Sequence, residues 1–123
     1  GENPHARGWE KIVYYRKMGD IGHNGGNWVV GNQPFIFAQQ NVAMELNMDS
    51  NPRTLTFFVN NEEQQNYVTN IPQVVRFWAY CWNLNTQFKI NKFEYLSTPT
   101  AKHGENTHAY EYGTTWKKYC SIQ

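Results

Sequence analysis

NVAMELNMDSNPRTLTFFVNNEEQQ, residues 41–65, is the stretch that decides the fold. From Val42 to Met48 the large apolar residues stand at every second position, and the same alternation returns from Arg53 to Val59. Asp49-Ser50-Asn51-Pro52 separates the two runs. Period-two alternation on both sides of a turn predicts a β-hairpin with one buried face. We expect that face to carry Val42, Met44, Leu46 and Met48 from the first strand and Leu55, Phe57 and Val59 from the second.

The opposite face of this hairpin is polar, with Glu45, Asn47, Thr54 and Thr56. We expect it to meet water or a partner, because only one face of such a sheet needs to be buried. Asp49 is expected to close the turn through its own backbone. Asn60-Asn61 is a second turn signal, since asparagine tolerates the left-handed conformations of tight hairpin loops. A short partner strand is therefore predicted from Asn66 to Thr69.

The rest of the chain also favours strands. Aromatic residues make up 16% of the 123 residues, and turn residues recur every ten residues or so. That combination favours a single antiparallel β-sandwich over a helical bundle. Further strands are predicted at residues 9–15, 21–23, 74–82 and 86–95.

Charge and leader patterns exclude several classes of function. The net charge is +1 and the basic residues are scattered, so nucleic acid is not an expected partner. No apolar stretch reaches the roughly 20 residues that cross a bilayer, so no membrane partner is expected, and no leader-like segment is recognised. Cys81 and Cys120 are too few for a disulfide scaffold and are expected to be reduced. These features together predict a cytoplasmic protein.

The composition changes after residue 96. Residues 97–123 are predicted to form a C-terminal extension to a sandwich domain of residues 1–96. Within it Tyr112, Trp116 and Tyr119 are spaced by four and three residues, which would align them on one helical face. Gly113 disfavours a helix. The stripe is expected to pack on the sandwich or on another protein.

The sequence resembles a SPRY domain over roughly residues 9 to 96. The resemblance is carried by the alternating strand that ends in Leu46-Asn47-Met48-Asp49 and by the following Arg53-Thr54-Leu55-Thr56-Phe57-Phe58, which is similar to the family's Thr-Leu-Ser/Thr-Phe strand. Asn60-Asn61, the segment Val68 to Pro72 and the upstream Ile21 to Gly25 agree in order and spacing. The resemblance implies a jelly-roll or concanavalin-like sandwich.

The same resemblance implies a protein-interaction module without catalytic residues or cofactors. In relatives that capture short peptides, part of the binding surface lies at the end of the strand that matches Val74 to Trp82 and in the next loop. The matching positions are Cys81, Trp82 and Asn83. The strands that normally open a SPRY sandwich have no counterpart before Trp9, which predicts an open sheet edge able to pair with something.

Aromatic residues on the predicted strand 74–82 reinforce that placement. Trp78, Tyr80 and Trp82 would form a row on the face opposite Val75, Phe77 and Cys81. Aromatic side chains supply large contact areas and concentrate at binding hot spots. The row either binds a partner or covers the second sheet or the C-terminal extension.

The sequence contains no motif typical of an enzyme or of a metal site. His103 and His108 lie five residues apart without cysteines or carboxylates at ligand spacing, so no metal is expected. Glu62-Glu63 is expected to be solvated charge. Two other functions stay open: a constitutive subunit of a larger assembly, and a carbohydrate-binding sandwich that uses exposed aromatics with Asn and Asp.

Overall fold

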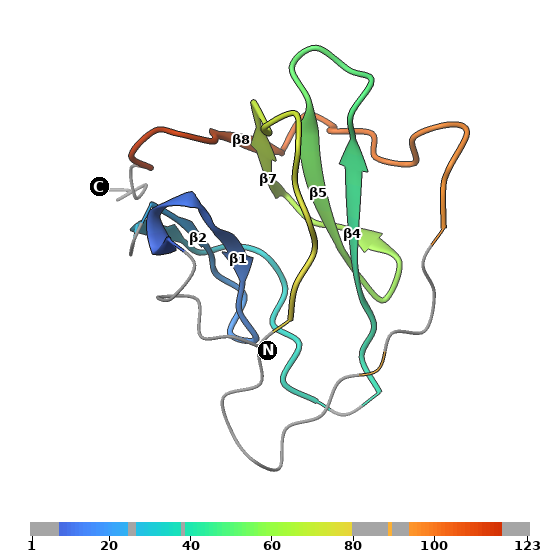
Figure 1. Ribbon diagram of the computed structural model, residues 1–123. Coiled ribbons are helices and arrows are strands. Elements are labelled where there is room, and N and C mark those ends of the chain that lie inside the picture. Colours follow the sequence, from blue (N-terminus) through green and yellow to red (C-terminus); the bar gives the residue numbers. More distant parts are fainter. Residues whose placement is uncertain (1–7, 25–26, 38, 80–88, 90–93, 117–123) are drawn as a thin grey trace.

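The protein folds into two β-sheets (Figure 1). The structure is a computed structural model that describes residues 8–24, 27–37, 39–79, 89 and 94–116. A short 3-10 turn, η2 (Trp9–Lys11), precedes a three-stranded sheet in the order β1-β2-β3. A five-stranded sheet has the order β4-β5-β7-β8, with β6 also paired to β5. The strands are β1 (Val13–Tyr15), β2 (Ile21–His23), β3 (Asn27–Val29), β4 (Val42–Asn47), β5 (Thr54–Val59), β6 (Glu62–Glu63), β7 (Asn66–Thr69) and β8 (His108–Glu111).

The central hairpin is confirmed, and the structure adds its register. Strand β4 pairs antiparallel with β5, so that Val42 is opposite Val59, Met44 opposite Phe57 and Leu46 opposite Leu55. Apolar residues therefore face apolar residues across the hairpin, as the alternation predicts. The partner strand β7 also lies where it was expected.

The two turns of this hairpin region are built by asparagines. Asn60 and Asn61 adopt positive φ angles of 49° and 69°, which confirms the second turn. In the first turn the expected role of Asp49 is wrong. Asn47 closes that turn, because its Oδ1 accepts hydrogen bonds from the backbone N–H groups of Asp49 and Ser50 at 3.2 and 3.1 Å.

The core lies between the two sheets. It joins side chains from both sheets and from the chain beyond β7 and β8: Ile21, Val29, Leu55, Phe57, Val68, Ile71, Tyr110 and Trp116. Leu46 packs against this cluster as expected. The expectation for Met44 is wrong, since 43% of its side chain is exposed. Strand β4 is thus only partly covered.

Residues 108–116 form a strand and a turn, not the helix considered for the C-terminal segment. The helix expected there is absent from this part of the chain, where β8 pairs with β7 in a parallel arrangement. The pairing joins residues 66–69 to 108–111, so β8 belongs to the same sheet as the hairpin. Trp116 packs on the core without a helix, and its Nε1–H donates to the Glu111 carbonyl at 2.9 Å. Tyr119 lies outside the described residues.

The structure corrects, or only partly describes, three other predicted strands. Residues 74–79 of the predicted strand Val74–Trp82 are irregular, so the prediction is wrong for them; Tyr80, Cys81 and Trp82 lie outside the described residues. Most of the predicted strand 86–95 also lies outside them. The predicted strand 9–15 shortens to β1, preceded by the η2 turn.

The outer face of the five-stranded sheet is covered by the chain itself. A segment of residues 100–103, named the strap below, lies over the polar face expected to meet water or a partner. The Glu45 carboxylate accepts from the N–H groups of Thr100 and Ala101, at 3.2 and 3.0 Å. The Glu63 carboxylate accepts from those of Lys102 and His103, at 2.6 and 2.8 Å. Carboxylates on the sheet thus satisfy backbone donors of a segment that lacks strand partners.

A pair of buried asparagines ties the end of the three-stranded sheet to β7. Asn32 Oδ1 accepts from the Asn66 backbone N–H at 2.8 Å, and Asn32 Nδ2–H donates to the Asn66 carbonyl at 3.1 Å. The Asn32 side-chain amide therefore pairs with the Asn66 backbone as a neighbouring strand would. In return, Asn66 Nδ2–H donates to the Val30 carbonyl at 3.0 Å. Both side chains are buried, so the hydrogen bonds fix how the two sheets meet.

Candidate interaction surface

The predicted binding residues fall at the limit of the described chain. Trp78 is described, with 37% of its side chain exposed, in the irregular segment that follows β7. Tyr80, Cys81, Trp82 and Asn83 lie outside the described residues. The structure therefore neither brings these five residues together nor separates them.

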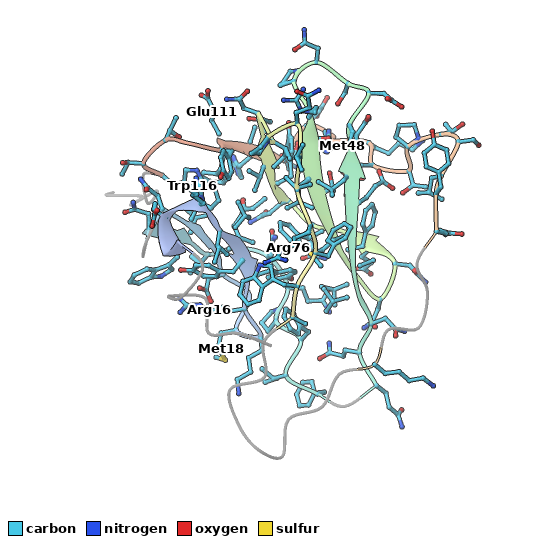
Figure 2. All side chains as sticks on the ribbon, in the orientation of Figure 1. Arg16, Met18, Met48, Arg76, Glu111 and Trp116 are labelled. Carbon is cyan, nitrogen blue, oxygen red and sulfur yellow. The ribbon has the colours of Figure 1, made fainter. Side chains whose placement is uncertain are left out.

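The segment that leads to this predicted site is apolar and exposed. Val74 is 87% exposed, and Val75 and Phe77 are each 39% exposed. Arg76 is the charged residue of this segment and is labelled in Figure 2. Single exposed apolar residues are ordinary in proteins, but a consecutive run of them is a feature of binding surfaces. The alternation that suggested a core face and an aromatic face does not apply to residues 74–79, because no strand forms there.

A second apolar surface lies on β4. Val42 and Met44 are 40% and 43% exposed, and Met48 on the same face is 36% exposed, although this face also carries Leu46, which packs against the core. The position of Val42 and Met44 at the outer strand of the sheet explains their exposure, because in the described part of the chain β4 has a neighbouring strand on one side only. Sequence alternation identified the face correctly but could not show that this part of it is left uncovered.

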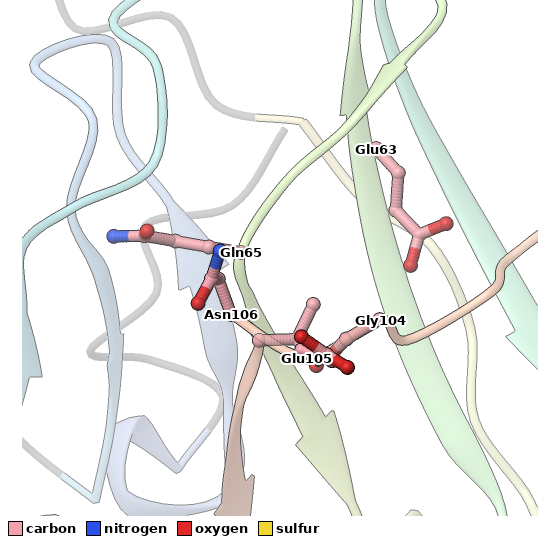
Figure 3. A pocket seen from close by; sticks show the side chains of 6 residues that line it. Glu63, Gln65, Gly104, Glu105 and Asn106 are labelled. Atoms are coloured by element: carbon pink, nitrogen blue, oxygen red, sulfur yellow. Dashed lines mark hydrogen bonds between the residues drawn. The ribbon is translucent and has the colours of Figure 1, made fainter.

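A shallow, open hollow of about 380 Å³ lies where the strap turns toward β8 (Figure 3). No sequence pattern indicated it. Its lining is polar, with two carboxylates, two amides and a hydroxyl: Glu63, Gln65, Gly104, Glu105, Asn106 and Thr107. The Glu63 carboxylate is already hydrogen-bonded to the strap, so the expectation that Glu62-Glu63 is simply solvated charge is wrong for Glu63.

His23 is the most enclosed ionisable side chain of the three-stranded sheet. It is 1% exposed, and its ring lies 4.4 Å from the Tyr112 ring and 5.3 Å from the Trp116 ring, centroid to centroid. Its Nε2 accepts from the Gly113 N–H at 2.9 Å, so the proton must sit on Nδ1, which donates to the Ile12 carbonyl at 2.9 Å. Burial lowers the pKa of His23, against the opposing effect of the Ile12 carbonyl.

The geometry gives His23 a structural role. Both ring nitrogens are occupied by backbone groups, so neither is available to a substrate or a metal. No sequence pattern indicated this position, since one histidine in a short strand has no distinguishing pattern.

The other histidines likewise form no metal site in the described part of the chain. His103 stacks on Tyr67, with ring centroids 3.8 Å apart, and its Nε2 lies 2.7 Å from the Thr56 hydroxyl. Among the described residues no three His, Cys, Asp or Glu side chains gather as metal ligands would. Within the same residues, no helix has the length and apolar character needed to span a membrane.

Comparisons with protein families, with curated proteins and with solved structures gave no match for this chain. The two-sheet, all-β arrangement is what the structure shows.

Proposed function

We propose that this chain is a non-catalytic protein-interaction module of SPRY type, which binds a partner peptide or protein surface through residues 78–83. One observation carries the proposal. The segment from Val74 to Trp78 is irregular and presents apolar side chains to solvent, and it leads directly into the predicted binding residues.

The physical argument concerns the free energy of contact. Exposed valine, phenylalanine and tryptophan side chains gain about 25 cal/mol for each Å² of apolar surface that a partner covers. Trp78 is followed by the residues Tyr80, Cys81, Trp82 and Asn83, which supply further aromatic area and an amide for backbone hydrogen bonds. A peptide with apolar side chains and an extended backbone would suit this composition.

The runner-up is a constitutive subunit of a larger assembly. The half-exposed Val42 and Met44 on β4 favour it, because an obligate interface is more apolar than ordinary surface. Gel filtration of the isolated chain separates the two proposals. A well-behaved chain that stays soluble alone supports the module, and an isolated chain that aggregates supports the obligate subunit.

A random-peptide display selection tests the proposed module. We expect the wild-type chain to enrich a consensus peptide, and the double substitution Trp82→Ala with Asn83→Ala to weaken binding of that peptide at least tenfold. Trp78→Ala should also weaken it. Val30→Ala is the matched control, because Val30 is 74% exposed and lies outside this segment. Circular dichroism checks that each variant is folded. A folded double variant with unchanged affinity would refute the placement, and no enrichment at all would refute the function.

A further inference from the structure

Strand β4 forms an unprotected edge of the five-stranded sheet. It spans six residues and pairs only with β5 among the described strands. It contains neither proline nor lysine, the residues that commonly guard exposed edges. Its only charged residue, Glu45, points to the outer face, where it holds the strap.

The hydrogen-bonding groups that face outward on β4 can be identified from the register. The Asn60 N–H donates to the Asn41 carbonyl at 2.8 Å, which marks residues 41 and 60 as a hydrogen-bonded pair. Hydrogen-bonded and non-hydrogen-bonded pairs alternate along an antiparallel ladder. The N–H and C=O groups of Val42, Met44 and Leu46 therefore point away from β5, toward the free edge. In Figure 1 residues 94–99 run beyond this edge, and no hydrogen bond joins them to these three residues.

At the opposite edge of the same sheet, the last carbonyl of β8 is already hydrogen-bonded. On β8, the Glu111 carbonyl accepts three hydrogen bonds from the turn that follows: from the Thr114 N–H at 3.3 Å, the Thr114 hydroxyl at 2.8 Å and the Trp116 Nε1–H at 2.9 Å. Figure 2 shows Glu111 and Trp116 at this edge. On β4, the outward groups of Val42, Met44 and Leu46 have no such partner among the described residues.

The sequence of β4 is complementary to itself in one antiparallel register. With Met44 opposite Met44 of a second copy, Val42 lies opposite Leu46, and all three residues present their outward groups to one another. The apolar faces then join into one stripe, and Ala43 lies opposite Glu45, which leaves room for the strap. Two neighbouring registers would also form hydrogen bonds. One sets the Glu45 carboxylates of the two copies directly opposite each other, and the other sets Leu46 opposite Gln40, which lies outside β4. Like charges directly opposite each other are unfavourable.

We infer that β4 pairs with β4 of a second copy of this chain, with Met44 opposite Met44 on the two-fold axis. The two five-stranded sheets become one continuous sheet. The inference does not rest on the peptide site proposed at residues 78–83. An edge of this length buries less surface than a standard interface, so the dimer should dissociate on dilution.

A cysteine scan of β4 tests the register. In a background with Cys81→Ser and Cys120→Ser, Met44→Cys should form a disulfide-linked dimer under mild oxidation, because directly opposite Cα atoms in a hydrogen-bonded pair lie about 5.5 Å apart. Val42→Cys is the matched control on the same face. Its two copies would stand four residues apart along the strands, about 13 Å, too far for a disulfide. Preferential cross-linking of Glu45→Cys would overturn the proposed register.

Sedimentation velocity of the uncross-linked protein tests the dimer itself. The wild-type chain should show a monomer–dimer equilibrium, and Met44→Lys should shift it at least tenfold toward monomer by setting two ammonium groups face to face. Met44→Pro provides a second variant, because it removes an outward N–H that the hairpin does not use. A wild-type chain that remains monomeric at millimolar concentration would overturn the inference, as would variants that remain folded and dimerise unchanged.

Discussion

Substitution of Asn32 by alanine tests whether a side-chain amide fastens the two sheets to each other. The change removes both hydrogen bonds that Asn32 makes with the backbone N–H and C=O of Asn66. Asn32 is 5% exposed and Asn66 is 1% exposed, so the two backbone groups lose their partners in a buried site. Leaving one buried group unsatisfied costs about 1–3 kcal/mol, so the two groups together give a loss of about 2–6 kcal/mol in the free energy of unfolding. That is a large part of the ~5–15 kcal/mol total of a small domain.

Urea unfolding followed by circular dichroism measures this loss as a lower midpoint with an unchanged slope. Asn106→Ala is the matched control, because Asn106 is exposed; it should change the free energy of unfolding by less than about 0.5 kcal/mol. Asn32→Asp keeps the acceptor for the Asn66 N–H but sets a carboxylate oxygen against the Asn66 carbonyl, so it should destabilise at least as much as alanine. A loss below about 1 kcal/mol for Asn32→Ala, or a harmless Asn32→Asp, would refute the reasoning.

Three other predictions concern separate parts of the fold. Gly22→Ala should lower the free energy of unfolding by about 1–3 kcal/mol in urea unfolding, because the new Cβ would collide with the Tyr14 ring. Gly104→Ala, where a new Cβ would meet no atom within 4 Å, should be neutral in the same experiment. The contribution of His23 to stability should be complete above its ordinary pKa of 6.5 and be lost as the pH falls below that value, because the unfolded chain binds the proton at a higher pH than the folded chain. Melting temperatures from pH 8 to pH 5 should fall for the wild-type chain and fall less for His23→Gln; equal slopes would contradict this. Glu63→Gln should speed amide hydrogen exchange at Lys102 and His103, whose N–H groups the carboxylate accepts, whereas Glu105→Gln should leave both rates unchanged; unchanged rates in Glu63→Gln would show that the strap is held by other contacts.

Sequence patterns predicted the strands that pair with partners close to them in the chain. The hairpin β4–β5 has alternating apolar residues on both strands and asparagines at its turns, and its two strands formed where this pattern predicted them. Strands β2 and β7 were found in the same way. In each case the pairing partner is near in sequence, so the alternation and the turn together determine the arrangement.

Interactions between distant segments escaped prediction. Strand β8 pairs with β7 from about 40 residues away, and its sequence His-Ala-Tyr-Glu has a single large buried side chain, Tyr110. The spacing of Tyr112 and Trp116 is also compatible with a helix. In the structure, Trp116 packs on the core after β8 without a helix. The irregular stretch 74–79 shows the reverse error, since strand-forming residues need an available partner strand.

The candidate surfaces show the same difference between local and long-range interactions. Val74 and Trp78 are exposed and the strand expected there is absent from residues 74–79, while the binding role of Trp78 stays a prediction. The hollow beside Glu63 and the buried ring of His23 arise from segments far apart in the chain, so no short motif could indicate them.

The most direct test of the proposed function is an NMR titration of the isotope-labelled chain with its selected peptide. We predict that the largest shift changes occur at the indole N–H signals of Trp78 and Trp82 and at the backbone of the residues between them, and that the signals of Glu63, Glu105 and Asn106 stay in place. Shift changes confined to the hollow, or to β4, would contradict the account.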